Sequence, residues 1–244
     1  MNETFFSVIV VSLNAESTIR VTIDSVLDQN CQDFELIVKD GGSGDGTLTQ
    51  IPNDSRIRVV QKADTSVYDA MNQAIEYAQG KFLLFLNCGD TLADANVLAD
   101  VKAFAEKRNF AGREVMYGDC IIRGKILPQP VELDRKHFIK EGLCHQSVFF
   151  GKALLNCSRG YDLAFEICAD YELLVHLFIT GAKFYHVGRP VCIYQGGGIS
   201  ERRENLGRVR REGNRVRRRY FTFRERVYYN MKRIRRRIAR LAHC

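Results

Sequence analysis

The N-terminal half of the chain alternates short apolar runs with longer segments whose apolar residues recur every three or four positions. Phe5–Val11 is a continuous run rich in β-branched residues, as in strands buried on both faces of a parallel sheet. In Ser66–Ala78 the apolar residues lie on one helical face, and Gly80 follows as a stop signal. The pattern predicts strands at Phe5–Val11, Phe34–Val38, Ile57–Val60 and Phe82–Leu86, and helices at Ala15–Gln29, Ser66–Ala78 and Val97–Glu106.

Strands that alternate with helices indicate an α/β fold, with a mainly parallel sheet flanked by helices. Asn14 is the candidate N-cap of the first helix. After residue 110 the segments become shorter and more mixed, so we expect the second half to add a wall beside the sheet. Its predicted elements are strands at Val115–Tyr117 and Cys120–Ile122, a turn at Arg123–Lys125, and helices at Asp134–Glu141 and Tyr171–Thr180.

The composition is that of an ordinary globular protein. The chain has 244 residues, of which 45% are hydrophobic and 27% charged, with 4 Pro. These values exclude collagen-like, low-complexity and fully disordered classes. The apolar stretches are far shorter than the ~20 residues of a membrane-spanning helix, and we expect no secretory signal because no basic segment precedes the first run. The 8 Cys show no CxxC pair and no zinc-finger spacing, so we expect scattered, reduced thiols.

Basic residues are concentrated at the C-terminus. Residues 201–244 contain 17 Lys and Arg against 4 acids, whereas residues 1–200 have 19 bases and 25 acids. We therefore expect a globular domain at 1–200 and a basic amphipathic helical tail at 201–244 that docks on an anionic membrane surface. Packing on the globular part, or pairing of two chains in a homodimer, is the alternative. The apolar stripe of the tail consists of Val216, Tyr220, Phe223, Val227, Met231, Ile234, Ile238 and Leu241.

Polar residues follow three of the predicted strands. Ser12–Asn14 follow the first, Asp40–Thr47 follow the second, and Asn87–Asp90 follow the fourth. Ligands of open α/β sheets bind beyond the carboxyl ends of parallel strands. We therefore expect these three clusters to form one site at one edge of the sheet.

The Gly-rich cluster at Asp40–Thr47 has two interpretations. Its glycines suit an ordinary turn, and Asp45 with Thr47 suits a cap for the next helix. Alternatively, the glycines let a ligand approach the backbone, and the Asp40 carboxylate accepts a hydrogen bond from a base or a ribose. The cluster is neither a G-x-G-x-x-G motif nor a P-loop, so the two common phosphate-binding motifs are excluded.

Two further carboxylates are candidates for chemistry. Asp90 suits Mg²⁺ or Mn²⁺, which prefer oxygen ligands and take one or two carboxylates together with substrate phosphates. An ordinary turn aspartate is the alternative. Asp170 precedes an apolar helical stripe, so it is either an N-cap or a functional carboxylate kept ionised by the helix N-terminus.

The segments that carry candidate chemistry occur in the order Ser7–Asn14, Asp40–Thr47, Tyr68–Asn72, Leu86–Asp90, Cys144–Ser147 and Ala169–Glu172. Together these motifs resemble those of the family 2, GT-A-fold glycosyltransferases, and are most similar to small bacterial enzymes that build exopolysaccharide, colanic acid and O-antigen repeat units. The resemblance spans about residues 5–200.

The resemblance implies an inverting transfer of a sugar from a nucleotide-diphosphate sugar of the UDP or GDP type. It implies that Asp40 holds the nucleobase, Asp90 binds Mn²⁺ or Mg²⁺ on the diphosphate, and Asp170 is the general base. His145 and Gln146 are expected to face the acceptor or the diphosphate, with a hydrogen-bonded core histidine as the alternative for His145. The other residues expected at the site are Ser12, Asn14, Gly41, Asp45, Tyr68, Asn72 and Asn87.

Two departures from the family pattern refine this expectation. Asn87 replaces the first acid of the usual D-x-D, which removes one carboxylate from the expected metal site. The chain has no Trp, so it lacks the Gln-x-x-Arg-Trp motif of processive synthases, and Gly196–Ser200 occupies that region. We expect addition of a single sugar to a saccharide acceptor, linked to a polyprenyl diphosphate, at the cytoplasmic face of the plasma membrane.

Two other classes of function are weighed against this one. The basic tail suggests nucleic-acid binding, but residues 1–200 are net acidic and show no nucleic-acid-binding motif, so no nucleic acid is expected. A nucleotidyltransferase acting on sugar phosphates would use a similar sheet. The sequence specifies neither the donor sugar, the nucleobase nor the linkage.

Overall fold

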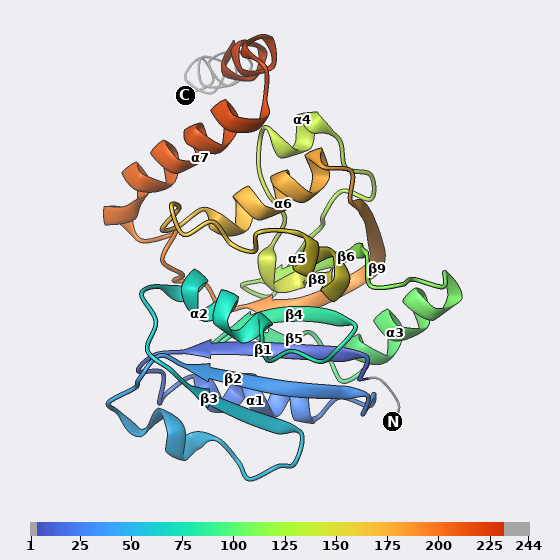
Figure 1. Cartoon of the computed structure of the whole chain (residues 1–244), viewed down its shortest axis with the longest axis vertical. Coiled ribbons are helices and arrows are strands. Elements are labelled where there is room, and N and C mark those ends of the chain that lie inside the picture. The colour runs from blue at the N-terminus through green and yellow to red at the C-terminus, as the bar shows by residue number, and fades with distance from the viewer. Residues whose placement is uncertain (1–3, 232–244) are drawn as a thin grey trace.

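The computed structural model describes residues 4–231. Its first half is the parallel sheet that the sequence predicts, with strand order β3-β2-β1-β4 (Figure 1). Every residue of β1 is buried, which explains why this central strand is apolar apart from Ser7 and Ser12. The strands are β1 (Phe6–Ser12), β2 (Phe34–Asp40), β3 (Ile57–Gln61) and β4 (Phe82–Asn87).

The second half extends the same sheet with strands of mixed direction. β8 pairs antiparallel with β4 and with β6, and β6 pairs parallel with β9. The two short strands predicted at 115–117 and 120–122 form one strand, β6, which turns at Arg123 and Gly124 into β7. The strands are β5 (Thr91–Leu92), β6 (Glu114–Ile122), β7 (Lys125–Leu127), β8 (Val148–Gly151) and β9 (Lys183–Tyr194).

Helices cover both faces of the sheet. The apolar faces of α1 and α3 pack against one face of the sheet and form one core cluster with it. α2 and α6 belong to a second core cluster on the other face (Figure 1). Within residues 4–231 every helix is too short or too polar to cross a membrane. The bounds are α1 (Ile19–Leu27), α2 (Val67–Ile75), α3 (Val97–Lys107), α4 (Arg135–Phe138), α5 (Lys152–Cys157), α6 (Ala169–Ile179), and the 3-10 turns η1 (Gly46–Gln50), η2 (His145–Ser147) and η3 (Arg203–Asn205).

Two predicted helix caps are wrong. Thr18, not Asn14, stands at the N-cap of α1, and Asn14 adopts the left-handed conformation, with φ of 51°. Cys168 is the N-cap of α6, so Asp170 lies inside the first turn of that helix. Asp170 is therefore not the N-cap residue that its sequence position suggested.

The C-terminal segment does not form the single helix that the apolar stripe predicted. α7 (Leu206–Tyr220) ends at Phe221, and a second helical segment covers 223–231. Val216 and Phe221 are buried in the core that contains α6. This part of the stripe therefore packs on the globular part, which was the alternative to membrane docking. Phe223 beyond the break is 72% exposed. Ile234, Ile238 and Leu241 lie outside the described residues.

Candidate active site

The register of the parallel strands brings the predicted polar clusters to one edge. Ser12 at the end of β1 pairs with Asp40 at the end of β2, and Val11 pairs with Asn87 at the end of β4. The clusters therefore share one edge, or rim, of the sheet, as expected, although the Asp40–Thr47 cluster does not line the cavity beside it. This rim forms one side of the site, and residues of η2 and α6 approach from the second half of the chain.

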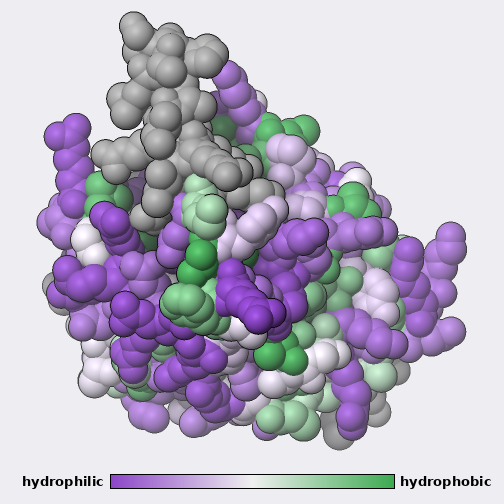
Figure 2. Space-filling model, turned by 90° about the horizontal axis from the view of Figure 1, so that it is seen from above, coloured by the Kyte–Doolittle hydropathy of each residue, from purple (hydrophilic) through white to green (hydrophobic). Residues whose placement is uncertain are grey.

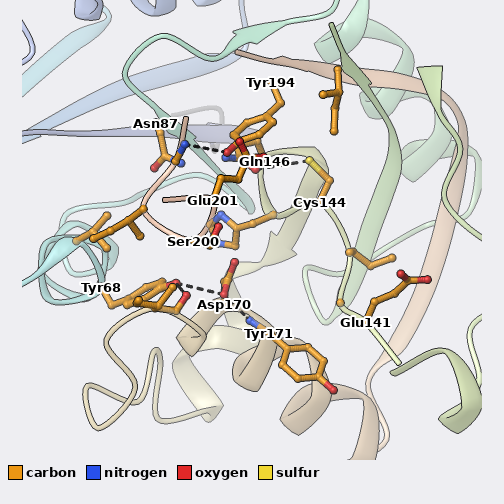
Figure 3. Close-up of a pocket in the computed structure, with 18 of the residues that line it drawn as sticks. Tyr68, Asn87, Glu141, Cys144, Gln146, Asp170, Tyr171, Tyr194, Ser200 and Glu201 are labelled. Carbon is orange, nitrogen blue, oxygen red and sulfur yellow. Dashed lines mark hydrogen bonds between the residues drawn. The ribbon is translucent and has the colours of Figure 1, made fainter. Parts of the chain in front are cut away.

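A cavity of about 820 Å³ opens beside this rim. Five of the residues singled out in the sequence line it: Tyr68, Asn87, His145, Gln146 and Asp170 (Figure 3). The other seven do not contribute to its wall; these are Ser12, Asn14, Asp40, Gly41, Asp45, Asn72 and Asp90.

Asp170 projects into the cavity from the first turn of α6. Its Oδ1 accepts a hydrogen bond from the Tyr171 backbone N–H at 2.7 Å and one from the Tyr68 hydroxyl at 3.2 Å. Burial, together with the Asp170 charge, raises the pKa of Tyr68, so this phenol remains a donor. In Figure 3 the Asp170 carboxylate points toward the segment that contains Ser200 and Glu201. A half-buried carboxylate held in this way suits a general base.

Asp90 lies behind the cavity wall and is only 3% exposed. Its carboxylate accepts hydrogen bonds from Gln146 Nε2 and from the Gln195 backbone N–H, both at 3.0 Å. Burial raises the pKa of Asp90 to about 6, although the hydrogen bonds from Gln195 and Gln146 act to lower it. Within residues 4–231 no cationic side chain forms an ion pair with this carboxylate. A buried carboxylate with two neutral donors and no counter-charge fits a divalent cation whose remaining ligands are substrate oxygens.

Asp40 stabilises the loop that follows β2. This residue is fully buried, and its carboxylate accepts four hydrogen bonds: from the Gly42 and Ser43 backbone N–H groups, each at 2.9 Å, and from the Ser12 and Ser43 hydroxyls. Although burial opposes ionisation, these bonds outweigh it and lower the pKa of Asp40. The carboxylate therefore fixes the loop after β2, and its expected contact with a nucleobase stays a prediction.

Three neighbours of Asp40 also act within the loop rather than on the cavity. Asn14 Oδ1 accepts a hydrogen bond from the Gly44 N–H. A side chain at Gly41 would place its Cβ 2.6 Å from Asp64 Oδ2, so this glycine permits a close packing contact. Asp45 caps η1 by accepting from the Thr47 N–H at 3.0 Å, which is the capping alternative.

His145 and Asn72 are both tied to Tyr161. His145 Nε2 lies 2.6 Å from the Tyr161 hydroxyl, and burial lowers the pKa of His145, so the imidazole is neutral. Asn72 forms two hydrogen bonds of 2.9 Å with the Tyr161 backbone N–H and C=O. His145 is therefore a hydrogen-bonded core histidine at the cavity wall, and Asn72 anchors the segment after α5.

The side chains at the cavity that sequence reasoning missed include Glu141, Tyr194 and Glu201. Glu201 accepts a hydrogen bond of 2.9 Å from the Gly197 N–H, and Tyr194 accepts one of 3.2 Å from the Gly198 N–H. The segment after β9 thus folds over the cavity (Figure 3). The glycines at Gly196–Gly198 are a turn signal in the sequence. The position of this turn over the site, however, follows from the placement of β9, which the local sequence does not specify.

Comparison with known sequences identifies similar proteins. A family model described as Glycosyl transferase family 2 matches residues 7–145. A PGL/p-HBAD biosynthesis glycosyltransferase of Mycobacterium bovis is 35% identical over 206 residues, which cover 80% of this chain and 78% of that protein. WfgD of Escherichia coli, a UDP-Glc:alpha-D-GlcNAc-diphosphoundecaprenol beta-1,3-glucosyltransferase, is 31% identical over 163 residues, 66% of this chain and 59% of its own.

Solved structures show the same fold. TarS of S. aureus in complex with UDP-GlcNAc has a TM-score of 0.67 at 20% identity, over 80% of this chain and 59% of that chain. The mannosyltransferase PcManGT of Pyrobaculum calidifontis, in complex with GDP-Man and Mn2+, has a TM-score of 0.60 at 18% identity. The match covers 84% of this chain and 60% of that chain. The chain thus spans about three fifths of these structures. The predicted GT-A class, an α/β sheet flanked by helices, is confirmed.

Proposed function

Because this chain belongs to glycosyltransferase family 2, whose members use nucleotide sugars, we propose that it transfers one sugar, with inversion, to a lipid-linked saccharide. The observation that carries this proposal is the shared cavity. Asn87, from the end of β4, and Asp170, from the first turn of α6, face the same space of about 820 Å³. That space holds a nucleotide sugar and the reacting end of an acceptor, since ligand cavities commonly measure 300–1,000 Å³.

Asp170 is the proposed general base. As an acceptor hydroxyl oxygen attacks the sugar C1, the Asp170 carboxylate takes its proton, and the bond from C1 to the diphosphate oxygen breaks with its electron pair on the diphosphate. Tyr68 and the Tyr171 N–H hold Oδ1, which orients the carboxylate. Positioned proton transfer of this kind contributes about 10²–10⁴-fold to the rate.

Asp90 and Asn87 are the proposed holders of Mn²⁺ or Mg²⁺, which when bound would offset the charge of the leaving diphosphate. Gln146 positions the Asp90 carboxylate through its 3.0 Å hydrogen bond. The Mn2+ in the mannosyltransferase complex supports a divalent cation in this fold. The loop built around Asp40 shapes the rim beside this position without contacting the cavity.

The acceptor is proposed to be linked to a polyprenyl diphosphate in the membrane, a proposal supported by the acceptor in the name of WfgD. Exposed arginines without an ion pair in the described chain include Arg210, Arg211, Arg218 and Arg224. Near them Phe223 and Tyr228 are 72% and 53% exposed. Figure 2 views this end of the molecule and shows hydrophobic residues scattered among hydrophilic ones. Such a surface suits the anionic cytoplasmic leaflet.

A donor panel followed by product analysis tests the proposal. Thermal unfolding is recorded with UDP, GDP and their sugars, each with and without Mn²⁺, because a ligand that binds the folded state raises the midpoint. The stabilising donor is then incubated with a polyprenyl-diphosphate saccharide and with the free saccharide. We expect the labelled sugar on the lipid-linked acceptor, with opposite anomeric configuration by NMR. Release of pyrophosphate without sugar transfer would contradict sugar transfer.

A further inference from the structure

Three cysteines that are distant in the sequence converge beside the cavity. Cys120 lies on β6, Cys192 lies on β9, and Cys144 immediately precedes η2. Cys120 and Cys192 are direct neighbours in the register of β6 and β9, and both are fully buried. The sulfurs of all three lie within 4.8 Å of one another. The expectation of scattered thiols is therefore wrong for these three.

The spacing of the sulfurs matches that of ligands around one metal ion. Cys144 Sγ is 3.8 Å from Cys192 Sγ, and Cys192 Sγ is 3.4 Å from Cys120 Sγ. Two thiolates bound tetrahedrally to Zn²⁺ at about 2.3 Å stand about 3.8 Å apart. The thiols already stand at nearly this separation, so the ligands require little movement to bind a cation.

We propose that Cys120, Cys144 and Cys192 bind a thiophilic divalent cation of the Zn²⁺ class, with water as the fourth ligand. Three protein ligands with one open position are a common zinc arrangement. Access is through Cys144, which lines the cavity and is half-buried. The two sulfurs behind it supply the enclosed part of the site.

This site differs in chemistry from the position proposed at Asp90. Thiolates select soft cations, whereas a carboxylate with amide and phosphate oxygens selects Mg²⁺ or Mn²⁺. The two positions are linked by Gln146, whose Oε1 is 3.5 Å from Cys144 Sγ and whose Nε2 donates to Asp90 at 3.0 Å. A cation at the thiols replaces the Cys144 proton and so removes one hydrogen bond from Gln146.

The test titrates the reduced full-length protein with Co²⁺ as the spectroscopic substitute for Zn²⁺. We expect one equivalent of Co²⁺ to bind and to give thiolate-to-cobalt charge-transfer absorption. Zn²⁺ should displace the Co²⁺ and abolish this absorption, whereas excess Mg²⁺ should leave it unchanged. Cys144→Ser should lower Co²⁺ affinity by more than about 100-fold, since loss of even an outer-shell partner costs about 10–100-fold. Cys157→Ser is the matched control, because Cys157 is exposed and outside the cluster.

Cys192→Ser is the second variant, and its folding is checked by thermal unfolding before the titration. A folded Cys192→Ser protein should also lose the absorption. The proposal is overturned if the wild type gives no thiolate band, or if Cys144→Ser and folded Cys192→Ser both keep it. Formation of a disulfide between Cys120 and Cys192 in place of cobalt binding would likewise overturn it.

Discussion

The Glu212 carboxylate of α7 accepts a hydrogen bond from the backbone N–H of Cys168, the N-cap residue of α6, at 2.9 Å. The same carboxylate accepts from the Ile167 and Glu166 N–H groups, at 3.0 and 3.1 Å. Glu212 is only 9% exposed, so these bonds lie in the interior. A residue of the basic C-terminal segment thus fixes the turn that leads to Asp170. The negative charge at this helix start is also favourable for the α6 dipole.

Glu212→Ala should lower the free energy of unfolding by about 1.5–3 kcal/mol, because hydrogen bonds to a charged group are lost in the interior. The displaced start of α6 should also lower kcat by up to about 100-fold while the donor Kd changes little. Denaturant unfolding and steady-state kinetics measure the two effects. Glu204→Ala, at an exposed position of η3, is the control. If both variants behave alike, Glu212 does not position α6.

Asp170→Asn should leave the donor Kd within about twofold and lower kcat by about 10²–10⁴-fold, because it removes the base but not the shape of the cavity. Donor binding by calorimetry and turnover by product analysis separate these quantities. Glu201→Gln is the comparison variant, because Glu201 is another carboxylate that lines the cavity. Should Glu201→Gln lose turnover while Asp170→Asn keeps it, the base is Glu201.

The affinity for Mn²⁺ in the presence of a nucleoside diphosphate should fall as the pH is lowered below about 6. Burial raises the pKa of Asp90 to about 6, so above this pH the carboxylate is free for the cation. Below it a proton must first be displaced, and the affinity should fall about tenfold per pH unit. Asp90→Ala should abolish the stimulation of donor binding by Mn²⁺ at every pH. An unchanged stimulation would remove Asp90 from the site.

A protein truncated after Met231 should keep its fold and donor binding but bind anionic vesicles at least about 100-fold more weakly. The deleted segment contains 6 Lys and Arg, and each base near an anionic leaflet contributes about 1 kcal/mol. Vesicle sedimentation at two salt concentrations measures the effect, with neutral vesicles as the control. If the truncated protein still sediments fully, residues 232–244 do not contribute and the basic residues that remain up to Met231 suffice for binding.

Removal of the whole basic segment is expected to have a different result. Truncation after residue 200 deletes Glu212 and the buried residues Val216 and Phe221, so it should destabilise the domain itself. The midpoint of thermal unfolding compares the two truncated proteins. Equal midpoints would indicate that α7 adds nothing to the stability of the globular part.

The sequence by itself determined the parallel half of the sheet and the edge at which the site lies. Short, mostly apolar and β-branched runs such as Phe6–Val11 favour strands inside a sheet covered on both faces. Parallel strands then bring the residues that follow them, among them Ser12, Asp40 and Asn87, to a common edge. These conclusions need only local periodicity and the geometry of strands.

Only the tertiary structure decided which polar side chains face the cavity. Asp40 and Asp45 carry the same chemical group as Asp170, yet both oxygens of each accept hydrogen bonds within the loop region, whereas the hydrogen bonds to Asp170 go to Oδ1. Glu212 lies 44 residues from Cys168 in sequence, and the Cys144–Cys192 contact spans 48 residues. Such contacts follow from the packing of α7 on α6 and of η2 against β9, which no local pattern specifies.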